Sequence, residues 1–151
     1  MRRTVLFVLV AAIGGILYFT LRPGTPARTF DAYELKAKDT AESLLSSVQT
    51  AQLVSHAAAA GRAFGPYVSV SLSESETAIG ETSSGFAGLQ PPDRRADRLR
   101  EELSRVAARA ENVVGQLRIN ARRGELSGLQ RQAKPLARVV DQLERFTEAH
   151  G

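Results

Sequence analysis

The chain has 151 residues, of which 43% are hydrophobic and 24% charged, with a formal net charge of +4. This composition is ordinary for a globular protein, which excludes disorder throughout, and the length predicts one domain beside the N-terminal segment. Cysteine is absent, which excludes disulfides, a thiolate nucleophile and a cysteine-ligated metal. The charge is uneven: residues 29–90 carry three bases and seven acids, and residues 91–151 thirteen bases and nine acids. Because such halves can pair within one domain, the basic balance does not by itself predict an anionic partner.

The N-terminal segment is apolar. Residues 4–21 carry no charge and as a helix would be about 27 Å long, close to the roughly 30 Å of a bilayer core. We therefore expect residues 1–22 to be a single-pass transmembrane anchor, an uncleaved signal-anchor that contacts lipid through 4–21. Arg2 and Arg3 favour a cytoplasmic N-terminus and an extracytoplasmic domain. A cleaved signal peptide is the alternative.

Two smaller features accompany this anchor. Pro23, Gly24 and Pro26 predict a hinge over 23–30. Ala11 and Gly15 have the small-xxx-small spacing of membrane-helix contacts, which is also common in helices that make no such contact.

The domain is expected at 31–151, with helices at roughly 31–60, 66–89, 92–123 and 126–149. Residues 31–60 place apolar or small side chains at three- and four-residue steps, and Gly61 is a natural stop. The stripe comprises Ala37, Ala41, Leu44, Val48, Ala51, Ser55 and Ala58.

Residues 92–123 continue this spacing. Pro91, Pro92 and Asp93 suit a first turn, and Gly124 suits the end. The stripe comprises Ala96, Leu99, Leu103, Val106, Ala110, Val113, Leu117 and Asn120.

Residues 126–149 continue it as well, with Val139 and Phe146 widening the apolar face. Ser127 and Gln130 have capping-box spacing. Pro135 removes one backbone hydrogen bond and can bend a helix. Because the stripe keeps its register across this proline, we expect one kinked helix rather than two short ones. The stripe comprises Leu126, Leu129, Ala133, Leu136, Val140, Leu143 and Thr147.

Residues 65–89 are ambiguous. The sequence VSVSLS at 68–73 alternates like a half-buried strand, but Val68, Leu72, Ile79 and Phe86 also fit the helical steps, and these extend over the whole segment. A strand needs a partner strand, and none is predicted, so we expect a helix. Its Ser, Thr and Gly residues lower its intrinsic stability, and it must depend on docking.

Together these stripes predict an all-α fold: a transmembrane helix followed by an antiparallel up-down-up-down four-helix bundle. A three-helix bundle with a loose Ser/Gly-rich loop at 65–90 is the alternative.

The sequence offers little catalytic chemistry. His56 is expected on an outer face and His150 in a frayed terminus, and neither belongs to a metal-ligating motif. The carboxylates lie off the apolar stripes, where we expect solvent exposure rather than acid–base function. They are Glu74, Glu76, Glu81, Glu101 and Glu102. We therefore expect no enzyme, no cofactor, no metal and no small-molecule ligand.

The sequence DRRADRLREELSR at 93–105 is the strongest charge feature. Its arginines alternate with acids at ion-pairing distances along a helix: Asp97 with Arg100, Arg98 with Glu102 and Glu101 with Arg105. No aromatic residue is interleaved to stack a base. We expect a solvated face and no nucleic-acid binding.

Residues 51–60 indicate a partner. Leu53, Val54, Ala57 and Ala60 surround this helix with apolar atoms, which is typical of a covered surface. The alternative is that the alanines serve only as good helix formers and that nothing packs against them. We therefore expect a membrane-anchored scaffold or accessory subunit that binds a protein partner or a second copy. The alternatives are an extracytoplasmic ligand-sensing bundle that acts through a partner and, if the leader is cleaved, a secreted soluble bundle.

Overall fold

The computed structural model describes residues 29–150, and their regular structure is helical. The expected anchor at 1–22, with Ala11 and Gly15, and residues 23–28 of the hinge lie outside the described residues. None of the described helices is long and apolar enough to cross a membrane. The elements are α2 (Phe30–Ala59), α3 (Gly65–Ala87), α4 (Arg94–Arg122), the 3-10 turn η1 (Leu126–Gly128), α5 (Leu129–Gln132) and α6 (Lys134–Ala149).

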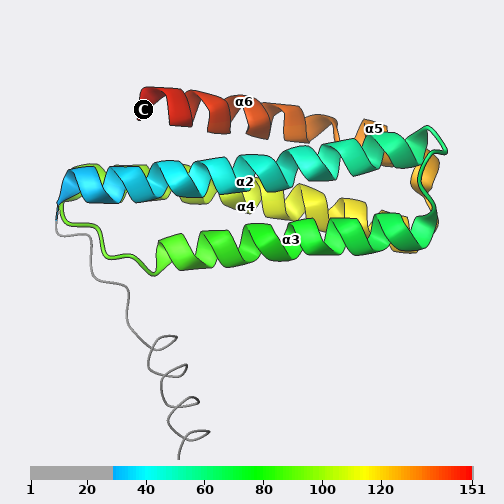
Figure 1. Cartoon of the computed structure of the whole chain (residues 1–151), viewed down its shortest axis with the longest axis horizontal. Coiled ribbons are helices and arrows are strands. Elements are labelled where there is room, and N and C mark those ends of the chain that lie inside the picture. The colour runs from blue at the N-terminus through cyan, green and yellow to red at the C-terminus, as the bar shows by residue number, and fades with distance from the viewer. Residues whose placement is uncertain (1–28, 151) are drawn as a thin grey trace, which may run out of the picture.

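The helices form a bundle, as predicted. In Figure 1, α3 returns alongside α2, α4 runs behind this pair, and α6 returns along the other side of α2. The neighbours in order are therefore α2, α3, α4 and α6. The helices α4 and α6 contact each other less extensively than α2 and α6 do, so the α4–α6 side is the more open one.

One continuous core fills the bundle. The whole stripe predicted on α2, from Ala37 to Ala58, is buried, and Tyr33 extends it by one turn. On α3, Leu72 and Ile79 are fully buried, while Val70 is 56% exposed. The helical interpretation of 65–89 is therefore confirmed, and both the strand and the loose loop are wrong.

The stripe on α4 drifts from the expected heptad. Val114 is fully buried where Val113 was expected, and Val113 packs against the core with part of its surface. An α-helix has 3.6 residues per turn, so a strict 3.5-residue stripe turns away from the core over several turns. On α6, Val139 and Phe146 are buried, as expected of side chains that widen the apolar face, while Val140 and Thr147 are half-buried.

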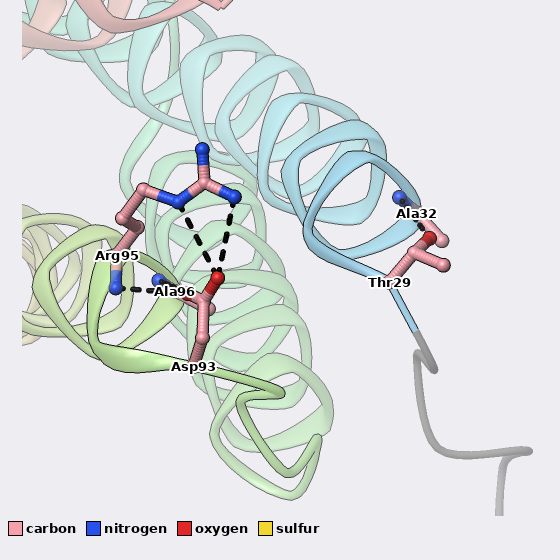
Figure 2. A network of polar contacts seen from close by, with 5 residues as sticks. All are labelled: Thr29, Ala32, Asp93, Arg95 and Ala96. Carbon is pink, nitrogen blue, oxygen red and sulfur yellow. Dashed lines mark hydrogen bonds and ion pairs between the residues drawn. The ribbon is translucent and has the colours of Figure 1, made fainter.

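Two side-chain caps lie at the same end of the bundle (Figure 2). The Thr29 hydroxyl accepts a hydrogen bond from the Ala32 N–H at 3.3 Å, and the Asp93 carboxylate accepts from the N–H groups of Arg95 and Ala96 at 2.8 and 3.0 Å. The hydrogen bond from Ala96 is the main cause that lowers the pKa of Asp93. Asp93 is thus the N-cap of α4, and the expectation that Pro91 and Pro92 belong to its first turn is wrong.

Glycines end two helices as predicted. Gly61 and Gly124 have φ angles of 67° and 79°, in the left-handed region. After α2, the N–H of Arg62 donates to the Ala57 carbonyl at 2.9 Å, and the N–H of Gly61 donates to the Ala58 carbonyl at 3.0 Å. These two hydrogen bonds define a Schellman motif, and the same pattern ends α4.

The C-terminal segment is divided, which corrects the expectation of one kinked helix at 126–149. Residues Leu126–Gly128 form a 3-10 turn, Ser127 caps no helix, and Ala133 separates α5 from α6. Pro135 lies in the first turn of α6, where its missing N–H is tolerated. The segment still fills the core, because Leu129, Ala133 and Leu136 are buried on both sides of the break.

Candidate interaction surfaces

Large exposed apolar side chains concentrate at the end of the bundle where α2 turns into α3. Phe64 is 70% exposed and Tyr67 is 53% exposed, and their ring centroids are 6.0 Å apart. Val70 lies one helical turn after Tyr67 and is also exposed. We call Phe64, Tyr67 and Val70 the distal cluster, because Thr29 lies at the opposite end of α2. This cluster was missed in the sequence, although two aromatic residues flank the Gly65-Pro66 helix start.

The expected partner face on α2 is divided by the fold. Leu53 is 70% exposed and Ala60 is exposed, whereas Ala57 is half-buried. Val54 is 6% exposed and belongs to the core, so its place in a partner face is a correction. Small side chains let neighbouring helices pack closely on an alanine-rich helix. Residues on both sides of the predicted stripe, such as Val54, can then become buried.

Leu53 and His56 line a shallow groove between α2 and α5. The groove has a volume of about 390 Å³ and is completed by Gln130, Ala133 and Lys134. Leu53 therefore lies on the side of α2 that faces α5, whereas α3 packs on another side of α2. His56 is exposed, as expected.

His150 is placed differently from the expectation of a frayed terminus. Its Nδ1 atom lies 2.7 Å from Glu34 Oε1, and its ring lies 4.7 Å from that of Phe146. These contacts hold the end of α6 against the first turns of α2.

Of the expected surface carboxylates, Glu76 is also placed differently. It forms an ion pair with Arg118 that joins α3 to α4, and about three-quarters of each side chain is buried. Glu74, Glu81, Glu101 and Glu102 are exposed, as expected. Among the described residues, no three potential metal-ligating side chains lie close enough together to hold an ion.

The predicted ion pairs of 93–105 form in part. Arg100 Nη2 lies 3.1 Å from Asp97 Oδ1, whereas Arg98 and Glu102, and Glu101 and Arg105, do not pair. Arg95 instead contacts Asp93 at 3.3 Å and lies 4.1 Å above the Phe30 ring, which connects the start of α4 to the start of α2.

Two larger grooves carry opposite charge. Between α4 and α6, a groove of about 620 Å³ is lined by Arg105, Arg109 and Arg145, with Glu102 as the one carboxylate beside them. Between α2 and α3, a groove of about 640 Å³ is lined by Asp39 and Glu42 together with short side chains. Because the neighbour order is α2, α3, α4, α6, these grooves lie on opposite sides of the bundle.

Comparison with models of protein families, with curated proteins and with solved structures finds no match to this chain. The function is therefore argued from the described surfaces alone.

Proposed function

We propose that this chain is a non-catalytic, membrane-anchored scaffold or accessory subunit of a membrane or envelope complex. Its up-down-up-down four-helix bundle docks a partner protein at the α2–α3 end. Residues 1–22 are the anchor in this proposal, with the N-terminus in the cytoplasm and the bundle on the extracytoplasmic side.

The distal cluster is the observation that carries the proposal. Water-exposed aromatic rings are unfavourable unless something covers them, and adjacent exposed apolar side chains mark interaction sites. Of the five large apolar side chains that are exposed in the described bundle, four fall between residues 53 and 70. Leu53 is exposed at the same end of the bundle but on the side of α5, apart from the distal cluster.

The distal cluster lies far along α2 from the residues of the proposed anchor. The 30 residues of α2 span about 45 Å at 1.5 Å per residue, and the anchor precedes the first of them. A bundle tethered at Thr29 would present the distal cluster about 45 Å along the helix axis, where a protein in or beside the same membrane can reach it.

Partner capture from membranes tests the docking surface. The full chain is cross-linked in its native membrane, purified and analysed for co-purifying proteins. Phe64→Ser/Tyr67→Ser is expected to lose the partner, because both rings of the distal cluster are removed. Leu35→Ser is the matched control, since Leu35 is an exposed apolar residue at the other end of α2. Capture that is the same for both variants would contradict the proposal.

Intact mass tests the anchor separately. The membrane-extracted protein is expected to retain all 151 residues. Loss of the N-terminal segment would contradict the anchor and leave the docking surface to be judged by the capture experiment.

A further inference from the structure

The arginines of the α4–α6 groove lack acidic partners. Arg109 Nη1 donates to Gln142 Oε1 at 2.7 Å, and none of Arg105, Arg109 and Arg145 lies within ion-pairing distance of a carboxylate in the described part of the chain. Val106 and Phe146 form the apolar floor between them. The groove therefore presents three guanidinium groups above a small apolar strip, and we call it the basic groove.

The groove between α2 and α3 is complementary in charge and in side-chain length. It carries Asp39 and Glu42, and its remaining lining side chains are short: Ser43, Ser46, Ser47, Ala78 and Thr82. Lys36 approaches Asp39 at 3.5 Å, but both side chains are more than half exposed, and such a pair contributes little. We call this the acidic groove. Short side chains leave room for the long stems of arginines.

Most of the opposite charges on the two halves of the chain are not paired with each other within one bundle. Residues 29–90 have a net charge of −4 and residues 91–151 of +4. Among residues 29–150, one ion pair between permanently charged groups crosses between these halves, Glu76 with Arg118, and His150 makes a further polar contact with Glu34. The bundle is thus close to neutral overall but acidic on the α2–α3 side and basic on the α4–α6 side.

The two grooves also lie at matching heights. The starts of α2 and α4 are adjacent, because Arg95 covers the Phe30 ring. Counted from these starts, Asp39 to Ser47 lie about 14–26 Å along α2, and Glu102 to Arg109 lie about 12–23 Å along α4. A second bundle standing parallel to the first would therefore bring its acidic groove level with the basic groove.

We propose that the occupant of the basic groove is a second copy of this chain, docked in parallel through its acidic groove. The contact is heterologous, since it joins two different surfaces, and each copy keeps one free groove. Repetition would produce a row or, with a small rotation at each contact, a ring. The parallel orientation rests on the anchor of the proposed function. The distal cluster takes no part and stays free for another partner.

Cross-linking at introduced cysteines tests this arrangement, because the chain has no cysteine of its own. Ser43→Cys is placed in the acidic groove, and Gln142→Cys in the basic groove. The two full-length variants are reconstituted together in vesicles of neutral lipid and treated with a short bis-maleimide. We expect a cross-linked dimer in the mixture and not with either variant alone. Ser127→Cys is the control, because Ser127 is exposed in η1, at the end of the bundle opposite Thr29. It is expected to give no product with Ser43→Cys.

Charge reversal tests the chemistry of the contact. Arg109→Glu/Arg145→Glu in the Gln142→Cys chain is expected to abolish the product, since like charges then face each other. Asp39→Arg/Glu42→Arg in the Ser43→Cys chain is expected to restore it, which also shows that the reversed chain is folded. High salt is expected to weaken the product of the unreversed pair, because the Debye length falls from about 10 Å at 0.1 M to about 3 Å at 1 M.

Several outcomes would overturn the inference. Absence of product in the mixture would exclude the contact. A dimer formed by either single variant alone would show a symmetric interface. Equal cross-linking through Ser127→Cys, or a product indifferent to charge reversal, would show random collision. None of these depends on the partner captured by the distal cluster or on the intact mass.

Discussion

Arg118 on α4 and Glu76 on α3 form the ion pair that joins these two helices. The Arg118 Nε–H donates to Glu76 Oε2, and Nη2 donates to Oε1 at 3.4 Å. The hydrogen bond to Glu76 raises the pKa of Arg118 above its ordinary value. Gly115 lies beside the pair, where a Cβ atom would stand 3.1 Å from Glu76 Oε1. The Ser-rich helix α3 is thus connected to the basic half of the chain by a specific polar contact as well as by its apolar stripe.

This ion pair is expected to contribute modestly to stability. In a double-mutant cycle of Glu76→Gln and Arg118→Gln, measured by urea unfolding of the full chain at low ionic strength, we expect a coupling free energy of about 1 kcal/mol. The value exceeds that of an ordinary exposed pair because both side chains are mostly buried. A coupling near zero would show that the contact does not fix α3 on α4.

Two helical glycines are expected to respond differently to alanine. A Cβ at Gly85 on α3 meets no atom of the described part of the chain within 4 Å, so Gly85→Ala is expected to raise the free energy of unfolding by about 0.5–1 kcal/mol through helix propensity. Gly115→Ala is expected to gain less, since its Cβ must displace a carboxylate that Arg118 holds. Urea unfolding compares the two variants.

Combining Gly115→Ala with Glu76→Ala is the control. Without the carboxylate, the alanine at 115 is expected to recover the gain seen at Gly85. An equal gain from Gly115→Ala in the unaltered chain would contradict the close approach.

Tyr33 predicts a pH dependence. Its side chain is fully buried and packs on Phe86 at 5.3 Å between ring centroids, and its hydroxyl has no hydrogen-bond partner among residues 29–150. Burial raises the pKa of Tyr33 above its ordinary value of 10.0. We expect Tyr33→Phe to raise the free energy of unfolding by about 1 kcal/mol at neutral pH, because it removes an unsatisfied buried hydroxyl.

The stability difference between Tyr33→Phe and the wild type is expected to change at alkaline pH. The stabilising preference of the fold for protonated Tyr33 is present below pH 10 and is lost as the pH rises through the raised folded pKa. The advantage of Tyr33→Phe should therefore widen above pH 10 in urea unfolding measured across this range. Tyr67→Phe, at an exposed tyrosine, is the control and should show no such widening. A constant difference between Tyr33→Phe and the wild type would contradict the burial of the hydroxyl.

Periodicity and end signals predicted much of this fold. Every residue predicted in the α2 stripe is buried, because alanine and serine at these positions keep the helical steps. Gly61 and Gly124 end helices because glycine accepts a positive φ. The sequence predicts a helix at 65–89 despite the two-residue alternation at 68–73. The buried residues Leu72, Ile79 and Phe86 follow the three- and four-residue steps of a helix instead.

The remaining errors have physical causes. Val114 replaces Val113 because a straight helix drifts from a heptad. The break at Ala133 depends on the backbone conformation between α5 and α6. The apolar stripe continues across Pro135 and therefore does not predict this break. The surfaces were harder still: the distal cluster depends on which side of α3 faces the core, and the two charged grooves depend on which helices are neighbours.

A matched pair of substitutions in α3 tests the central claim, which is that the Ser-rich segment is a helix docked in a common core. Leu72 is fully buried and Val70, two residues earlier, is exposed; in a half-buried strand the two would share a face. By urea unfolding of the full chain, Leu72→Ala is expected to lower the free energy of unfolding by about 2–5 kcal/mol, and Val70→Ala to change it by less than about 0.5 kcal/mol. Comparable losses at both positions, or no loss at Leu72, would contradict the account.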